Sequence, residues 1–307
     1  MRHEKREHEN LDRPLETALE RLLERYAPAT RTRRLRWSRG ETQVLELGSG
    51  SPVLLLHGGM GSVVDWVPLL SSLAGRHRVF AVDRPGHGLA DPFDYAGVDL
   101  LEHACTFLRD VVDALGLATV DLVASSLGGL WAAAFALEHA DRVSHLVLPG
   151  APVGYKRGGP LFLRLLGLPV IGQRLGRRSM SNPTRESNRT FWSDFLVARP
   201  ECLADALLDA DVAHMRRNVE SMLGLLGRVL DARGIRRQLI LGRRWADVRV
   251  PTLFLWGERD AFGTPQEGEA LAAMNPSFRL IRIDDAGHLP WLDDAERVTV
   301  EIERFLA

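Results

Sequence analysis

The sequence predicts an α/β protein with a mostly parallel sheet flanked by helices and a helical insertion in its second half. Three observations predict this class. From position 52 onward, short apolar runs typical of buried strands alternate with amphipathic stretches typical of helices. This alternation stops between positions 151 and 245, where only helical patterns are clear. The length of 307 residues also exceeds the roughly 250 residues that a large α/β domain reaches without insertions.

The N-terminal segment predicts one helix ahead of the sheet. Residues 1–10 are highly charged, lack the apolar core of a signal peptide and are expected to be frayed. An apolar stripe at helical spacing follows from Leu15 to Tyr26, with Pro14 suited to the first turn and Pro28 to the end. We expect this helix to pack on its own domain, with packing on a partner as the alternative.

The sheet is predicted from a series of strand-like runs. In chain order they cover residues 33–37, 42–47, 52–56, 77–83, 120–124, 143–148, 250–256 and 278–283. The first two form a leading hairpin, and helices such as 66–73 and 99–115 separate later ones. Strands that alternate with helices form parallel sheets covered on both faces, and ligand sites lie at the carboxyl ends of such strands.

The candidate nucleophile directly follows the run 120–124. Residues 124–129 read Ala-Ser-Ser-Leu-Gly-Gly. The pattern small-x-Ser-x-Gly lets a strand turn sharply into a helix and presents the serine hydroxyl on that turn. Ser126 is chosen over Ser125 because only Ser126 has a small residue both two positions before it and two positions after it.

A glycine-rich loop supplies candidate hydrogen-bond donors for this serine's chemistry. Residues 57–61 read His-Gly-Gly-Met-Gly directly after the run 52–56. Such a loop can aim a main-chain N–H at the negative oxygen that develops during acyl transfer. The N–H of Gly59 is the first choice and that of Met60 the alternative, with the N–H of Leu127 beside the nucleophile as the second donor.

A serine hydroxyl needs a general base to take its proton, so a histidine and an orienting carboxylate are expected downstream. Both follow strand-like runs. His288 lies in the loop after 278–283, and Glu258 and Asp260 lie in the loop after 250–256. Position alone leaves either carboxylate open as the acid.

Four separated segments together resemble the α/β-hydrolase superfamily, in its single-domain, cap-bearing branch. They are residues 57–61, the Asp-Arg-Pro-Gly-His-Gly run 83–88, residues 124–129, and the pair 256–260 with 287–288. The segments stand in the family's order, and the resemblance extends from about residue 45 to the C-terminus. It implies a triad of Ser126, Asp260 and His288, because the family pattern Trp-Gly-x-x-Asp places the acid at Asp260.

The resemblance also implies a division of the chain. Residues 1–30 form the charged leader and helix, residues 31–150 and 246–307 the α/β-hydrolase core, and residues 151–245 a helical cap that roofs the triad. In the family such a cap supplies most of the substrate pocket.

Substrate contacts are expected from Met60, Ser125, Trp192 and Phe195. Two departures from the family pattern concern substrate preference rather than the triad. Ser125 stands where many relatives carry His, and Ala90 stands where the segment after Asp83 often ends in Ser.

Charge is unevenly distributed along the chain. Residues 151–245 contain sixteen Arg and one Lys against eight Asp or Glu, hence +9, whereas the whole chain is −1 and the remainder is therefore −10. The excess could attract an anionic substrate or partner. A solvated cap surface that faces an acidic core is the favoured interpretation, because the arginines are not interleaved with aromatic residues as in a nucleic-acid site.

Composition narrows the class further. Cys105 and Cys202 are the only cysteines and give no disulfide framework, and no cluster has metal-ligand spacing, so neither a metal nor a cofactor is expected. No run approaches the roughly 18 apolar residues of a membrane helix. We therefore expect a small-molecule substrate, no nucleic acid, no membrane span and a cytoplasmic location, and the oligomeric state stays open.

These observations predict a serine hydrolase that cleaves a carboxylic ester or a lactone through an acyl-enzyme intermediate. Carbon-carbon bond hydrolases and cofactor-free perhydrolases of the superfamily use the same triad and remain alternatives. A third hypothesis is a ligand-binding, receptor-like member with poor turnover. The serine at the turn argues against haloalkane dehalogenases and epoxide hydrolases, which carry an aspartate there.

Overall fold

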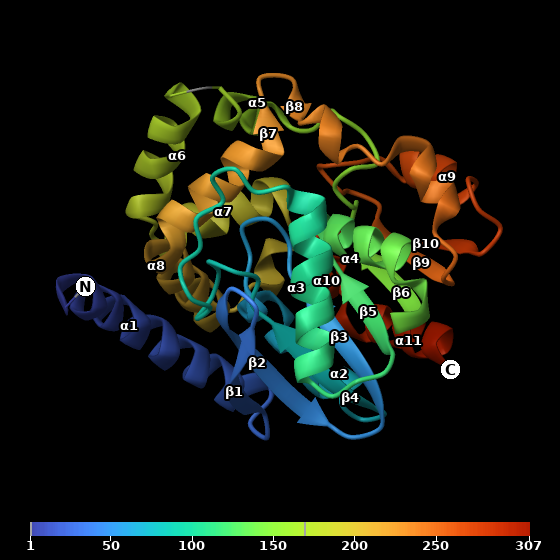
Figure 1. Cartoon of the computed structure of the whole chain (residues 1–307), viewed down its shortest axis with the longest axis horizontal. Coiled ribbons are helices and arrows are strands. Elements are labelled where there is room, and N and C mark those ends of the chain that lie inside the picture. Colours follow the sequence, from blue (N-terminus) through green and yellow to red (C-terminus); the bar gives the residue numbers. More distant parts are fainter. Residues whose placement is uncertain (1, 169) are drawn as a thin grey trace.

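The computed structural model describes residues 2–168 and 170–307, with side chains described from residue 11 onward. An eight-stranded sheet forms its centre, in the order β1-β2-β4-β3-β5-β6-β9-β10 (Figure 1). Its strands are β1 Arg31–Trp37, β2 Gly40–Gly48, β3 Ser51–Leu56, β4 His77–Val82, β5 Val120–Ala124, β6 Val143–Pro149, β9 Thr252–Gly257 and β10 Phe278–Ile283. Every predicted strand is confirmed, with small shifts at the ends.

Most of the sheet is parallel, as predicted. β1 pairs antiparallel with β2, and β2 antiparallel with β4, whereas all pairs from β4 to β10 are parallel. β3 shows why both faces are covered. Leu54 and Leu56 pack into one apolar cluster, and Val53 and Leu55 pack into a second cluster, because successive side chains of a strand point to opposite faces.

Different helices cover the two faces. α3 (Leu100–Ala114), α4 (Ser126–Glu138) and α9 (Pro265–Ala272) contribute buried residues to the first cluster, and α2 (Val67–Leu73) and α11 (Ala295–Leu306) to the second. The four-residue α10 (Pro290–Asp293) precedes α11. This layering leaves the carboxyl ends of the parallel strands free for a site.

The predicted helical insertion follows β6. It contains α5 (Leu161–Leu166), α6 (Ile171–Ser181), α7 (Arg185–Phe195) and α8 (Asp205–Val229). It also contains a short hairpin that the sequence did not predict, β7 (Leu230–Asp231) with β8 (Gly234–Ile235). α8, with 25 residues, is the longest of these four helices.

The N-terminal helix α1 spans Arg2–Tyr26 and differs from its prediction. It begins well before Pro14, so this proline lies inside the helix rather than in its first turn, and the leader expected to be frayed is helical from Arg2. Glu, Lys and Arg have good helix propensity, which explains the extension. α1 packs on α8 and α2 of the same chain, as expected, and Leu15 and Leu19 are buried there. No helix in the described part of the chain is long and apolar enough to cross a membrane.

Candidate active site

Ser126 lies on a strained turn between β5 and α4. Its φ is +53°, a left-handed conformation that non-glycine residues adopt rarely and at an energetic cost. A Cβ at Gly128 would lie 2.5 Å from the carbonyl oxygen of His57, so only glycine lets the helix start this close to the loop after β3. The sequence pattern is therefore realised as a sharp strand-to-helix turn.

His288 and Asp260 form a buried hydrogen-bonded pair. Nδ1 of His288 lies 2.9 Å and 3.0 Å from the two carboxylate oxygens of Asp260. The main-chain N–H groups of Ala151 and Phe262 also donate to this carboxylate, each at 2.8 Å. Glu258, the alternative acid, is exposed. The structure thus brings Asp260, and not Glu258, to His288.

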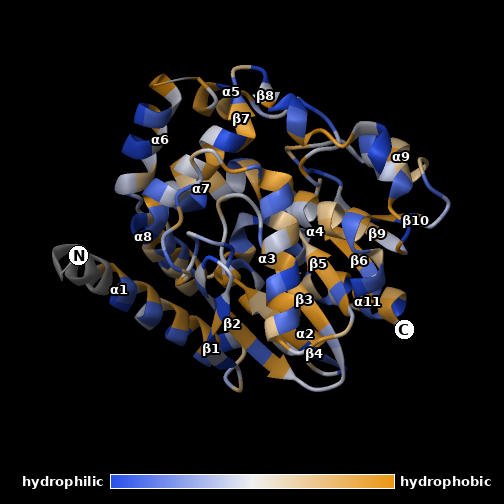
Figure 2. Ribbon diagram, viewed as in Figure 1, coloured by the Kyte–Doolittle hydropathy of each residue, from blue (hydrophilic) through white to orange (hydrophobic). Residues whose placement is uncertain are grey.

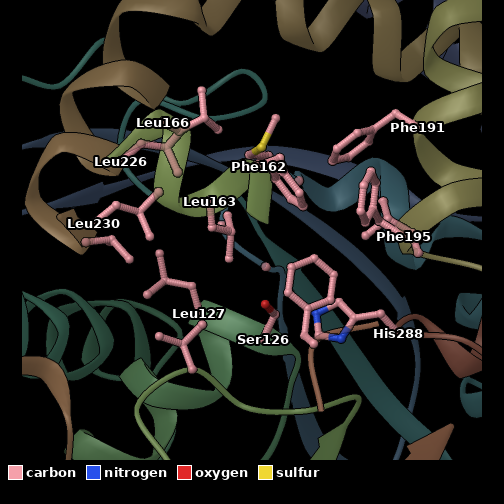
Figure 3. A pocket seen from close by; sticks show the side chains of 18 of the residues that line it. Ser126, Leu127, Phe162, Leu163, Leu166, Phe191, Phe195, Leu226, Leu230 and His288 are labelled. Atoms are coloured by element: carbon pink, nitrogen blue, oxygen red, sulfur yellow. The ribbon is translucent and has the colours of Figure 1, made fainter. Parts of the chain in front are cut away.

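The second imidazole nitrogen of His288 is left available. With Nδ1–H donating to Asp260, Nε2 carries no proton in the neutral ring and can accept one. This Nε2 is buried and has no hydrogen-bond partner among the described residues. Ser126 and His288 both line the same cavity, as Figure 3 shows.

Three histidine rings lie against three successive carbonyl groups of the glycine-rich loop, although His87 also faces the carbonyl of Pro85 through Nδ1 and its neutral ring can donate to only one of the two. His57 Nδ1 lies 3.0 Å from the oxygen of Gly58, His87 Nε2 lies 3.0 Å from that of Gly59, and His214 Nε2 lies 3.1 Å from that of Met60. Burial is the main cause that lowers the pKa of each ring, to about 4 for His214. The rings are therefore neutral near pH 7.

These contacts orient the main-chain donors of the loop. The peptide plane places the N–H of one residue opposite the carbonyl of the residue before it. Because the carbonyls of Gly58 and Gly59 point to the buried histidines, the N–H groups of Gly59 and Met60 point away from them. Neither N–H donates to another described residue. A Cβ at Gly59 would lie 3.7 Å from the Cβ of Leu127, so both candidate donors of the loop lie next to the start of α4.

His214 is a residue that the sequence did not single out. It lies on α8, in the helical insertion, and its Nδ1 accepts the N–H of Gly88 at 3.1 Å. Its ring proton must then be on Nε2, which donates to the carbonyl of Met60. One histidine on a long helix carries no sequence signal for such a contact, because its partners lie more than a hundred positions away.

A cavity of about 440 Å³ lies between the sheet and the insertion. Its roof is apolar and aromatic, as Figure 3 shows, with Phe162, Leu163, Leu166, Phe191, Phe195, Leu226 and Leu230. Of the predicted substrate contacts, Met60, Trp192 and Phe195 line this cavity. Sequence periodicity could not separate these residues from the packed interior of the insertion.

Ser125 departs from its prediction. It is buried, its hydroxyl has no partner among the residues described, and it is not part of the cavity wall. It is the last extended residue before α4, and a Cβ added at Gly58 would lie 3.6 Å from its hydroxyl oxygen.

The cavity wall contains carboxylates that the sequence analysis missed. Asp65 and Asp211 both line it. Oδ2 of Asp211 accepts hydrogen bonds from Nδ2 of Asn188 at 2.7 Å and Nε1 of Trp192 at 2.9 Å. Burial raises the pKa of Asp211 to about 7. Burial and then the nearby charge of Asp211 raise the pKa of Asp65 well above its ordinary value.

Positive charge is scarce in this wall. Lys156 is the single lysine or arginine among the described residues that line the cavity, and its ammonium lies 2.6 Å and 2.7 Å from the carboxylate oxygens of Glu267. The arginines of the insertion lie outside the cavity, and several pair with carboxylates. Examples are Arg157 with Asp231 at 2.6 Å and Arg189 with Asp205 at 2.7 Å.

Comparison with known proteins gives a consistent picture. Residues 53–301 match the model of the Alpha/beta hydrolase family. A 2-hydroxy-6-oxononadienedioate/2-hydroxy-6-oxononatrienedioate hydrolase of Cupriavidus pinatubonensis is 28% identical over 85% of this chain and 89% of its own. The protein of the same name from Burkholderia vietnamiensis is 29% identical, with the same coverage of both chains.

Solved structures with the same fold include two kinds of hydrolase. Carboxylesterase CesB from Bacillus subtilis has a TM-score of 0.77 and 20% identity, and covers 97% of this chain and 99% of its own. A meta-cleavage product hydrolase from Pseudomonas fluorescens IP01 has a TM-score of 0.72 and 20% identity, and covers 89% of this chain and 97% of its own. At these identities the likeness concerns the fold.

Proposed function

The chain belongs to the alpha/beta hydrolase family, and we propose that it hydrolyses a carboxylic ester or lactone with neutral, hydrophobic groups through an acyl-enzyme intermediate. Ser126 is the proposed nucleophile, His288 the general base and Asp260 the residue that orients the imidazole. The roles follow from the free Nε2 of His288, the Nδ1 contact to Asp260 and the strained turn at Ser126.

In the first half-reaction, Ser126 Oγ bonds to the carbonyl carbon while His288 Nε2 takes the hydroxyl proton. The carbonyl oxygen becomes an oxyanion, which accepts hydrogen bonds from the N–H of Leu127 and from that of Gly59 or Met60. When the intermediate collapses, the bond to the alkoxy oxygen breaks, and the leaving oxygen receives the proton from His288. Asp260 stabilises the imidazolium throughout.

In the second half-reaction, a water molecule takes the place of the alcohol. His288 accepts one of its protons as the water oxygen bonds to the acyl carbon. The second tetrahedral intermediate then expels Ser126 Oγ, which recovers its proton from His288. The products are a carboxylic acid and an alcohol, and no cofactor takes part.

The observation that carries the preference for neutral esters is the charge of the cavity wall. Its buried carboxyl groups, Asp65 and Asp211, carry no positive charge in either protonation state, and its lysine already bonds to Glu267, so the wall offers no free cation to a substrate carboxylate. The other walls are largely aliphatic and aromatic, and such pockets bind by burying apolar surface. A neutral acyl or alcohol group therefore fits this cavity better than an anionic group.

Carbon-carbon bond hydrolysis is the second candidate. The curated relatives at 28–29% identity are named for the hydrolysis of dienedioates and trienedioates, and this similarity extends over most of the chain. Those named substrates carry two carboxylates, which the wall described above does not favour. This conflict makes the charge of the substrate the decisive variable.

Three substrates of graded charge test the proposal. We expect nitrophenyl butyrate to be cleaved with a kcat/KM at least tenfold above that of the nitrophenyl hemisuccinate, with a flat response to ionic strength for both esters. We also expect a fluorophosphonate to label the wild type and not Ser126→Ala. Cleavage of a dienedioate without ester turnover would establish the second candidate. Ligand binding without turnover of any of the three would favour the receptor-like hypothesis.

A further inference from the structure

The helix pair α5 and α6 exposes an unusual amount of apolar surface. In the described part of the chain, six large apolar side chains are more than a third exposed, and five of them lie on or beside these two helices. Leu161 and Ile171 are the most exposed, at 66% and 64%. Figure 2 shows apolar and hydrophilic residues side by side on α6 at the edge of the molecule. Grouped exposed apolar residues mark interaction sites.

The two faces of α6 explain which residues are exposed. Gly172, Gly176 and Met180 recur every four residues and are buried, so they form the face that packs on the molecule. Ile171 and Leu175 also lie four apart and are exposed. Ile171 does not line the cavity either, so its exposed side chain gains little from the protein's own interior.

The same helix pair is strongly basic. Residues 157–185 contain six Arg and no Asp or Glu. Three of these arginines pair with carboxylates of other segments, namely Arg157, Arg177 and Arg185. The other three, Arg164, Arg174 and Arg178, are exposed and form no ion pair with a described residue. Basic and apolar side chains therefore share one surface.

This surface is continuous with the cavity. Leu165 and Leu175 are exposed and also line the cavity that contains Ser126. A molecule that binds to α5 and α6 would therefore lie next to the cavity.

We propose that the surface formed by Leu161, Leu165, Ile171, Leu175, Arg164, Arg174 and Arg178 docks the protein on an anionic lipid surface. Exposed apolar side chains enter the boundary between headgroups and acyl chains, and each arginine is attracted to negative headgroups. A second copy of this chain fits less well, because a symmetric contact would bring arginines against arginines. The docking is a binding property and does not depend on which bond the enzyme cleaves.

Vesicle flotation tests the docking with the full chain. We expect binding to vesicles of phosphatidylcholine with phosphatidylglycerol and much weaker binding to phosphatidylcholine alone. The double variant Leu161→Gln/Ile171→Gln should lower the partition coefficient at least tenfold. Neither residue lines the cavity, so hydrolysis of a soluble nitrophenyl ester should be unchanged in the same preparation.

The charge contribution has its own variant and its own control. Arg164→Gln/Arg174→Gln/Arg178→Gln should lower the partition coefficient at least tenfold at low ionic strength and less at high ionic strength. Arg31→Gln/Arg36→Gln/Arg279→Gln removes the same charge from exposed positions on β1 and β10 and should bind like the wild type.

Three results would overturn the docking surface. One is wild-type protein that binds both kinds of vesicle equally or neither kind. Another is undiminished binding by both the apolar and the arginine variants. The last is light scattering that shows wild-type dimers without lipid and monomers for Leu161→Gln/Ile171→Gln, which would assign the surface to self-association. If the wild type failed to hydrolyse the ester, this would count against the proposed reaction. The vesicle-binding measurements would still test the docking surface.

Discussion

The floor and the roof of the cavity are built in opposite ways. The floor consists of loops at the carboxyl ends of strands, and hydrogen bonds fix its groups, such as the pair of Asp260 with His288. The roof consists of helices of the insertion, and its aromatic rings are held by packing, such as Phe162 on Phe195 with ring centres 4.5 Å apart. Directional bonds set positions closely, whereas apolar packing tolerates exchange. We therefore expect the floor to determine the chemistry and the roof the choice of substrate.

The largest effects should come from the floor. We expect Asp260→Asn and His288→Ala each to lower kcat by about 10⁴-fold, because triad members act as a unit and the asparagine favours the wrong imidazole tautomer. Steady-state kinetics measure the loss, and circular dichroism checks the fold. Glu258→Gln, on the same loop but exposed, is the matched control and should keep near wild-type kcat. A larger loss in that control would reassign the acid.

Variants of His214 test whether the floor and the roof contribute independently to the reaction. His214 belongs to the roof helix α8, yet it donates to the Met60 carbonyl of the floor. We expect His214→Leu to lower kcat about tenfold to a hundredfold, less than the loss of a whole oxyanion donor, with little change in KM. His214→Gln retains a side-chain donor and should recover part of this loss. A trifluoromethyl ketone, which forms an oxyanion on the nucleophile, should lose affinity in parallel with kcat.

The control for the His214 variants is a variant that removes a different polar contact of α8. Arg228 donates from α8 to the carbonyl of Val98 at 2.8 Å and forms no hydrogen bond with the described residues of the glycine-rich loop. Arg228→Gln should therefore leave kcat and inhibitor affinity nearly unchanged. If kcat fell equally in His214→Leu and Arg228→Gln, the cause would be a general change in how α8 packs. The contact with Met60 would then have no role of its own.

The difference between floor and roof also explains what the sequence could predict. Ser126 and Gly59 lie in short motifs whose glycines satisfy local backbone requirements, and each motif follows a recognisable buried strand. Parallel strands bring their carboxyl ends to one edge, so the meeting of these loops follows from the fold class. For this reason the strands and the contact of Asp260 with His288 could be predicted from the sequence.

The contacts that α8 makes with distant parts of the chain could not be predicted from the sequence. The hydrogen bond of His214 to Met60 and the burial of Asp211 in the cavity wall depend on how α8 docks on the sheet. Helical periodicity gives the apolar face of α8 but not its position or rotation relative to a loop formed far earlier in the chain. The place of Ser125 outside the cavity wall likewise depends on the local path of the chain at the turn.

The smallest expected effect concerns the charged group of the roof, Asp211. Burial raises the pKa of its carboxyl from 3.8 to about 7, so the folded state binds this proton more tightly than the unfolded state. The resulting stability is fully present below pH 4 and is lost as the pH rises through 7. Asp211→Asn keeps an oxygen to accept from Trp192 and does not titrate. Relative to the wild type, its Tm should therefore be about 2–4 °C higher at pH 8 than at pH 5.

Asp209→Asn is the matched control for this difference, because Asp209 lies on the same helix, has a half-exposed side chain and pairs with Arg185. Its Tm relative to the wild type should not rise with pH. If the Asp211→Asn difference were the same at pH 5 and pH 8, Asp211 would not titrate in this range in the folded protein. An increase confined to Asp211→Asn, with kcat on a neutral ester changed by less than about tenfold, would show that a roof carboxylate can be neutralised without loss of chemistry. That outcome is the one expected if the floor alone performs the reaction and the roof acts through the charge and shape it presents to the substrate.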